Sequence, residues 1–356
     1  MGGGCAMTSL DLARASLRDV PAYAPDASSC SVDLRDNINL FGTPPSALAA
    51  VRATEPRSLT EYPDVAGRAL TGALAGQLGL CASEIVTGCG SDDVLDAAFR
   101  AVAEPGAVLA HPSPSFSMVP VFARLNGLAP VAVPLMADGA ANADAMLATS
   151  ARIIYLCSPN NPTGTVTAAE VVRRIVRESS AIVILDGAYA EFAPELEDLL
   201  SEAPALERLL VVRTFSKAWG LAGLRVGYAV GSAALVQAVQ KSRGPYKLNA
   251  VAERAAVTAL SQDGEWMRRH ATEAVECRER TVSALHSLGL SPLDSRGNFV
   301  CVPVPDARLV AEQLAVRGVA VRAFSGLPVY GDVLRVGMAP WPVVEQFVRA
   351  LREVLA

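Results

Sequence analysis

The sequence lacks the long apolar runs that a membrane-spanning helix requires. Its uninterrupted apolar stretches, such as Ala181–Leu185, have the length of a buried strand and fall far short of the roughly 20 residues that cross a bilayer. It also lacks a basic block, because Lys and Arg are scattered and the formal net charge is −5. The electrostatic signature of a nucleic-acid-binding protein is therefore missing. We expect small-molecule partners, with neither nucleic acid nor membrane among them.

Paired cysteines and clustered histidines are lacking too. The seven cysteines form no CxxC pair, which favours free thiols in a reducing compartment over a disulfide framework. The opening MGGGCAM has neither the basic residues nor the apolar core of a signal peptide. We therefore expect a cytoplasmic protein. The three histidines, at positions 111, 270 and 286, are too far apart to indicate a metal site.

What is present is an alternation of strand and helix patterns between about residues 65 and 235. Six short stretches rich in Val, Ile and Leu are typical of strands covered on both faces. They are Glu84–Thr87, Ala107–Ala110, Val131–Leu135, Arg152–Leu156, Ala181–Leu185 and Leu209–Arg213. Helices are predicted between them, at Ser91–Ala103 and at Thr167–Arg177, where Thr167 and Glu170 have the spacing of a capping box. The pattern predicts an α/β fold with a mostly parallel sheet and helices on both faces.

The pattern changes near residue 248. A long polar and Ala-rich helical stretch runs to about Leu288, and two short strand patterns follow at Phe299–Val304 and Val333–Met338. This change predicts a smaller α+β domain. We expect a large domain over residues 45–247, a small domain over 248–356, and an N-terminal arm, 1–44, that belongs to the small domain.

Four segments that follow predicted strands carry polar side chains suited to ligand binding, which such sheets place at the carboxyl ends of their strands. They are Thr87–Asp93, Ser158–Gly164, Asp186–Tyr189 and Thr214–Arg225. The first joins a strand to a helix, so its free N–H groups can hold an anion. Taken alone, each of the first two could equally be a structural turn. The last contains Lys217, and a lysine in such a place can lose its proton and act as a nucleophile.

In order and spacing these segments resemble the signature of the fold-type I pyridoxal-phosphate aminotransferases. The matching residues are Asn161–Gly164, Asp186 with Tyr189, Ser216–Lys217, and Arg225. More narrowly, the chain is similar to the histidinol-phosphate aminotransferase branch. That similarity lies in Leu17–Tyr23, Tyr62–Asp64, Gly88–Asp92, Val321–Arg322 and Leu334–Arg335.

The resemblance implies pyridoxal 5′-phosphate as cofactor and a role for each matching residue. Lys217 would bond to the cofactor aldehyde and carry protons, Asp186 would hold the proton on the ring nitrogen, and Asn161 and Tyr189 would bond the ring oxygen. Phe116 would stack on the ring, where the family often has Tyr. The phosphate would be held by Gly90, Ser91, Asp92, Ser216 and Arg225. Tyr62 would reach the phosphate of the neighbouring subunit, which implies a homodimer.

For the substrate, the resemblance implies an α-carboxylate held by Arg335. Arg322 and Tyr23 would hold a distal phosphate. Asn39 lies in Asn37–Gly42, the segment that matches the family's Asn-Glu-Asn-Pro-x-Gly motif at the entrance of the site. This sequence departs from the family at Gly187 and Ile38, which both replace glutamates, so the pocket is less acidic than in the histidinol-phosphate branch.

The predicted activity is transfer of an amino group between an amino acid, or a histidinol-phosphate-like amino-alcohol phosphate, and a 2-oxo acid such as 2-oxoglutarate. The alternatives within the fold are an aromatic amino acid aminotransferase, or an enzyme that uses the same carbanion for decarboxylation, elimination or cyclisation. A further alternative is a non-catalytic sensor domain, which would need a DNA-binding domain that this chain has no room for.

Overall fold

Seven short apolar segments form one sheet in the computed structural model, which describes residues 14, 17–18, 20 and 30–356. The strands are β2 Ile85–Cys89, β3 Val108–Ser113, β4 Ala129–Pro134, β5 Ile153–Cys157, β6 Ile182–Asp186, β7 Leu209–Thr214 and β8 Val226–Gly231. Their order is β2-β8-β7-β6-β5-β3-β4. The pairs from β7 through β4 are parallel, whereas β8 is antiparallel to both of its neighbours. The predicted α/β class is confirmed, and of the seven strands of this sheet only β8 was not predicted.

Helices cover both faces of this sheet. The helices between residues 45 and 262 are α1 Pro45–Arg52, α2 Arg57–Thr60, α3 Arg68–Leu78, α4 Gly90–Val102, α5 Met118–Leu125, α6 Ala143–Ala148, α7 Ala169–Glu178, α8 Asp198–Glu202, α9 Ala233–Ser242 and α10 Ala250–Gln262. Successive residues of β5 enter different cores: Ile154 packs in the cluster that contains Val172 of α7, and Ile153 in the cluster that contains Phe99 of α4. This alternation follows from the two-residue period of a strand, and it explains the uninterrupted apolar runs.

The predicted start of helix α7 is wrong by two residues. The helix begins at Ala169, with Ala168 in the capping position and no side-chain cap. The Thr167 hydroxyl is used elsewhere, since it accepts from the N–H of Ala141 at 3.0 Å. The Thr167 N–H donates to the Ser158 hydroxyl, also at 3.0 Å. Thr167 therefore fixes the loop that follows β5 instead of forming a capping box.

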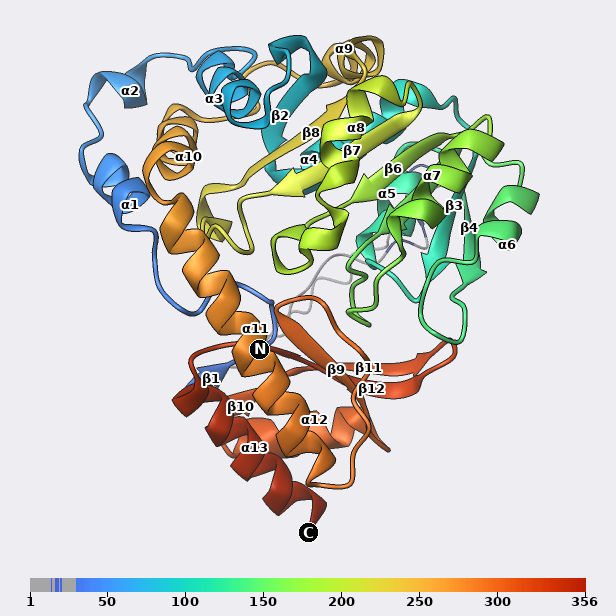
Figure 1. Ribbon diagram of the computed structural model, residues 1–356, viewed down its shortest axis with the longest axis vertical. Coiled ribbons are helices and arrows are strands. Elements are labelled where there is room, and N and C mark those ends of the chain that lie inside the picture. The colour runs from blue at the N-terminus through green and yellow to red at the C-terminus, as the bar shows by residue number, and fades with distance from the viewer. Residues whose placement is uncertain (1–13, 15–16, 19, 21–29) are drawn as a thin grey trace, which may run out of the picture.

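A second sheet and three helices form the smaller, lower part of the molecule in Figure 1. Strands β9 Phe299–Pro303, β11 Arg322–Leu327 and β12 Gly331–Gly337 form an antiparallel sheet in the order β11-β12-β9. The helices are α11 Gly264–His286, α12 Ala307–Val316 and α13 Trp341–Leu355. Near the N-terminus, β1 Val32–Asp33 pairs in parallel with β10 Val319–Ala320. Val32 and Leu34 thus share a core with the last third of the chain.

The predicted long helix of residues 248–288 is two helices, α10 and α11, that break at Asp263. Ala252, Ala255 and Ala256 of α10 pack in the core of the large sheet, whereas α11 runs from α10 to the side of the small sheet (Figure 1). The division of the chain at residue 248 stays a prediction.

Over residues 30–356 and the few described before them, no helix is both long and apolar enough to cross a membrane. Within the same part of the chain, no group of three or more His, Cys, Asp or Glu side chains could hold a metal ion.

Candidate active site

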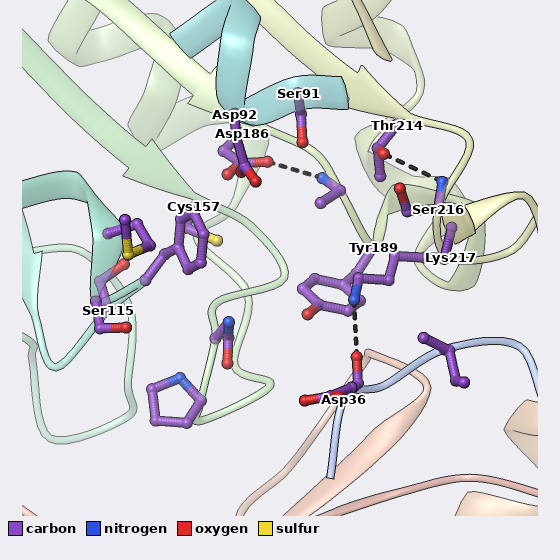
Figure 2. Close-up of a pocket in the computed structure, with 18 of the residues that line it drawn as sticks. Asp36, Ser91, Asp92, Ser115, Cys157, Asp186, Tyr189, Thr214, Ser216 and Lys217 are labelled. Carbon is purple, nitrogen blue, oxygen red and sulfur yellow. Dashed lines mark hydrogen bonds between the residues drawn. The ribbon is translucent and has the colours of Figure 1, made fainter. Parts of the chain in front are cut away.

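A cavity of about 620 Å³ opens where strands β5, β6 and β7 end, on the side of the small sheet. Figure 2 shows Asp186, Asp92 and Ser91 at one end of it, and Lys217, Tyr189 and Asp36 together nearer the small sheet. Most residues that the resemblance singled out line this cavity. They are Ser91, Asp92, Phe116, Asn161, Asp186, Tyr189, Ser216, Lys217, Arg225, Arg322 and Arg335.

Lys217 stands in the loop between β7 and β8. Its Nζ donates to the main-chain carbonyl of Asp36 at 2.9 Å and lies 5.6 Å from the centre of the Tyr189 ring. Burial lowers the pKa of Lys217 to about 8, and the nearby Arg335 guanidinium adds to that effect. An amine with this pKa is partly neutral near pH 8, as a nucleophile or a proton carrier must be.

Asp186 ends strand β6 and is buried. Its carboxylate accepts from the Tyr155 hydroxyl at 2.8 Å and from the Ala188 N–H at 3.0 Å. Burial raises the pKa of Asp186 to about 6, although both hydrogen bonds act in the opposite direction. No described lysine or arginine forms an ion pair with it. A buried carboxylate of this kind lacks a cationic partner, so its position suits a ligand with a protonated ring nitrogen.

Asn161, Tyr189 and Arg335 also line the cavity. The Arg335 Nη1 donates to the Asn161 side-chain oxygen at 2.6 Å, and its Nη2 donates to the carbonyl of Arg35. The Arg335 Nε is buried without a partner. Tyr189 accepts from the Asn37 amide at 3.2 Å, and burial raises the pKa of Tyr189 to about 12. The phenol thus stays protonated at neutral pH.

The turn between β2 and α4 fits an anion. Gly90 has a φ of +81°, and a Cβ there would lie 2.6 Å from the Arg225 Nη2. A Cβ at Gly227 would lie 2.3 Å from the Ser91 main-chain nitrogen. Arg225 also donates to the Ser216 hydroxyl at 3.3 Å. These glycines let a guanidinium, a hydroxyl and the first N–H groups of a helix gather closely, which is the donor set that a phosphate requires.

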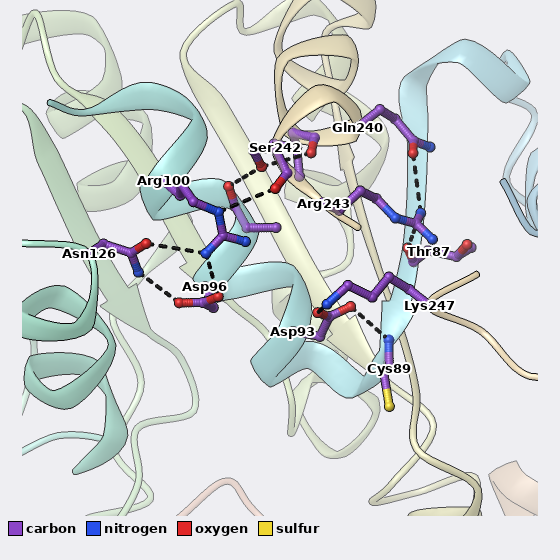
Figure 3. A network of polar contacts seen from close by, with 12 residues as sticks. Thr87, Cys89, Asp93, Asp96, Arg100, Asn126, Gln240, Ser242, Arg243 and Lys247 are labelled. Atoms are coloured by element: carbon purple, nitrogen blue, oxygen red, sulfur yellow. Dashed lines mark hydrogen bonds and ion pairs between the residues drawn. The ribbon is translucent and has the colours of Figure 1, made fainter. Parts of the chain in front are cut away.

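A polar network behind this turn holds it in place (Figure 3). The Asp93 carboxylate accepts from the Cys89 N–H at 3.0 Å and pairs with the Lys247 Nζ at 2.7 Å. Arg243 donates to the carbonyl of Thr87. The Asp93 carboxylate therefore closes the turn between β2 and α4.

Two of the predicted site residues, Tyr62 and Asn39, are not among the residues that line the cavity. Tyr62 is 84% exposed and stacks on Tyr246 with ring centres 4.7 Å apart, away from the cavity. The Asn39 amide donates to the carbonyl of Ala218, the residue after Lys217, at 2.9 Å and accepts from the Phe41 N–H, but Asn39 does not line the cavity. Tyr23 lies outside the described residues. Gly90 contributes through its backbone and is not among the lining side chains.

Three residues that were not predicted contribute to the cavity or contact its lining. Tyr155 bonds Asp186, Asn37 bonds Tyr189, and Asp36 lines the cavity and pairs with Arg322. A tyrosine inside the otherwise aliphatic run Arg152–Leu156 is a signal that could have identified the first, since a buried hydroxyl needs a partner.

Comparison with known proteins agrees with this geometry. The family model of aminotransferase class I and II matches residues 31–351. The chain belongs to this aminotransferase family. An aromatic amino acid aminotransferase of Corynebacterium glutamicum (strain R) is 37% identical over 320 residues, covering 87% of this chain and 92% of its relative. A histidinol-phosphate aminotransferase of Desulfitobacterium hafniense (strain Y51) is 32% identical over 352 residues, 96% and 97% of the two chains.

Among solved structures, the histidinol-phosphate aminotransferase of Sinorhizobium meliloti in complex with pyridoxal-5′-phosphate superposes with a TM-score of 0.87. It is 27% identical, and the match covers 98% of this chain and 99% of that one. The predicted family and the predicted enzyme class, a transferase of amino groups, are therefore confirmed.

Proposed function

We propose that this aminotransferase binds pyridoxal 5′-phosphate and moves an amino group between an amino acid, or a histidinol-phosphate-like amino-alcohol phosphate, and a 2-oxo acid such as 2-oxoglutarate. The observation that carries the proposal is that one cavity is lined by both Lys217, an amine of lowered pKa, and Asp186, a buried carboxylate. The Sinorhizobium neighbour, which holds this cofactor, supports it.

The residues fit the cofactor at both ends. Gly90, Ser91, Ser216 and Arg225 supply donors for its phosphate, with Asp92 beside Arg225 at 3.4 Å. Asp186 supplies the negative charge that keeps a ring nitrogen protonated, and Asn161 and Tyr189 supply hydrogen bonds for the ring oxygen. Phe116 lines the wall against which the ring would lie.

When bound, the cofactor draws electrons from the bonds of the substrate's α-carbon. The chain's own residues do the rest. Arg335 holds the substrate carboxylate at two points through its planar fork. The Lys217 Nζ removes the proton from the α-carbon and returns it during amino transfer, which its pKa of about 8 favours near neutral pH.

The amino donor has two candidates. A histidinol-phosphate-like donor is favoured by the D. hafniense relative and by Arg322 in the cavity wall. An aromatic amino acid is favoured by the C. glutamicum relative and by the apolar lining of the cavity. The large apolar side chains of that lining are Ile38, Phe116, Met118, Phe122 and Phe324.

Mixing the cofactor-loaded protein with single amino donors tests the proposal. Histidinol phosphate, phenylalanine and glutamate are each added without a 2-oxo acid, and the absorbance of the lysine-bound cofactor is followed. Transfer of the first amino group removes this absorbance and releases the matching oxo product. If no donor in the panel removes it, or if carbon dioxide is released instead, amino transfer is not the reaction.

A further inference from the structure

Asp36 and Arg322 form an ion pair in the wall of the cavity. The Arg322 Nη2 lies 2.8 Å from the Asp36 Oδ1, and the two side chains are 28% and 59% exposed. Both residues line the cavity. Figure 2 shows the Asp36 carboxylate on the side of the small sheet, close to Lys217. A substrate side chain that extends past Lys217 therefore meets this pair.

The register of the small sheet explains why Arg322 needs a counter-charge. Arg322 and Arg335 are direct partners across β11 and β12, and like charges opposite one another destabilise a sheet. Burial lowers the pKa of Arg335, Arg322 lowers it further, and Asp36 acts in the opposite direction. Asp36 thus supplies the negative charge that lets two arginines stand side by side.

A count of charges shows what remains for a substrate. Four cationic side chains line the cavity within the described part of the chain: Lys217, Arg225, Arg322 and Arg335. Under the proposed function, Lys217 holds the cofactor aldehyde, Arg225 its phosphate, and Arg335 the α-carboxylate. Arg322 is left for a distal anion, and Asp36 already neutralises it.

We propose that Asp36 is a specificity-determining residue that competes with a substrate's distal anion for Arg322. The inference rests on the proposed function. An uncharged side chain can lie beside the closed pair, against apolar Ile38 and Phe324, which also line the cavity. A distal carboxylate or phosphate must separate the pair and then lies near the Asp36 charge. The site therefore prefers donors with uncharged side chains over isosteric donors with an anion at the far end.

Glutamate and glutamine form a matched probe pair, because they differ in the distal charge and hardly in shape. The second-order rate constant of the half-reaction is measured for each with cofactor-loaded wild type and Asp36→Asn. The Asn keeps the main-chain carbonyl that accepts from Lys217 and removes only the charge. We expect the glutamate-to-glutamine ratio to rise roughly three- to tenfold, which is the scale of a partly exposed ion pair plus relief of repulsion.

The Arg322→Ala background separates competition from simple repulsion. There, Asp36→Asn should change the ratio by less than about twofold, because repulsion across solvent is screened. Glu312→Gln, on the exposed face of α12, is the matched control for loss of one negative charge and should leave the ratio unchanged. A ratio that stays within twofold in Asp36→Asn, or that rises equally without Arg322, overturns the inference.

Equilibrium binding gives a readout that does not depend on turnover. Succinate and its monoamide, succinamate, are titrated into the cofactor-loaded protein by calorimetry, and Asp36→Asn should raise the affinity for succinate about three- to tenfold relative to succinamate. Equal changes for both ligands contradict the inference. Failure of every amino donor to react in wild type would instead contradict the proposed function, so the two failures are distinguishable.

Discussion

At the scale of single residues, chemistry in this protein depends on where burial changes the acidity of a side chain. Lys217 and Asp186 have pKa values displaced in opposite directions, the lysine downward and the aspartate upward, and in both cases burial is the main cause. Each is displaced toward its neutral form. The lysine becomes available as a base, and the aspartate becomes a site that favours a cationic ligand atom.

Lys217→Ala tests the covalent anchor. We expect the variant to retain the cofactor through the turn at Gly90–Asp92, to lose the absorbance of the lysine-bound form, and to lose nearly all turnover, because both the anchor and the proton carrier are removed. Absorbance spectra and steady-state rates measure this. Turnover near the wild-type rate would rule out the assignment.

Arg335→Ala tests recognition of the α-carboxylate. Truncation of one partner of a buried charged pair costs about 2 to 5 kcal/mol, which corresponds to roughly 30-fold to a few thousand-fold in kcat/KM. We expect this loss with every amino-acid substrate and a normal cofactor spectrum. Arg322→Ala is the control, because it should lose activity mainly with substrates that carry a distal anion. A loss under about threefold in Arg335→Ala would mean that another group holds the carboxylate.

Asp186→Asn tests the buried carboxylate through stability. The pKa of Asp186 rises from 3.8 to about 6 on folding, so between these values the folded state binds more protons and wild-type stability falls as pH rises. The variant lacks this dependence. In the cofactor-free protein, the free energy of unfolding of Asp186→Asn minus that of wild type should increase by about 2 kcal/mol from pH 4 to pH 6. Urea titrations at several pH values measure it, and a difference independent of pH would contradict it.

At the scale of elements, α10 and Asp263, the residue that follows it, cap two helices from the N-terminal third of the chain. The Asp263 carboxylate accepts from the N–H groups of Ser46 and Ala47 at 3.0 and 2.9 Å, at the start of α1. Glu253 accepts from the N–H groups of Ala69 and Leu70 at the start of α3. Both acids are buried. Carboxylates at helix N-termini satisfy donors that have no partner within the helix.

Asp263→Ala should therefore destabilise the fold without touching the chemistry. It removes two charge-assisted hydrogen bonds and leaves two N–H groups unpaired, for an expected loss of about 2 to 4 kcal/mol in the free energy of unfolding. Asp263→Asn, which keeps one acceptor oxygen, should lose less. Urea denaturation compares the three proteins. An unchanged midpoint in the alanine variant would show that the bonds contribute nothing.

At the scale of the whole molecule, an exposed apolar patch surrounds Tyr62. Leu59 is 71% exposed, Tyr62 84% and Tyr246 40%. Exposed apolar patches of this kind mark interaction surfaces. We propose that a second copy of the chain covers this patch, so that the protein is a homodimer in which Tyr62 reaches the neighbouring cofactor phosphate.

Mixed dimers test this arrangement. Light scattering should give twice the mass of the chain. In a heterodimer of Lys217→Ala and Tyr62→Ala chains, a Tyr62 that acts across the interface leaves one complete site, with wild-type kinetics, and one site with both defects. Coexpression with two affinity tags isolates this species. If the heterodimer has only half the activity of the Tyr62→Ala homodimer, Tyr62 acts within its own chain.

Much of the fold could be predicted because strands buried on both faces are continuous apolar runs. Strand β8 escaped because Gly227 interrupts its run, and that glycine is needed where the strand passes the Ser91 nitrogen. The break between α10 and α11 at Asp263 was not predicted, because the Asp263 carboxylate accepts from the N–H of Ala47, 216 residues away in the chain. Local patterns cannot show a partner at that separation.

By itself, the sequence determined the class of chemistry, since Lys217, Asp186, Asn161 and Arg225 stand in short motifs that can be identified from their order and spacing along the chain. Only the tertiary structure decided how the cavity is charged around Arg322. Arg322 and Arg335 become neighbours through the register of two strands, and Asp36 meets them from the far end of the chain. Electrostatic pairing depends on distance in space, and these distances exist only after the N-terminal segment has folded against the last third of the chain.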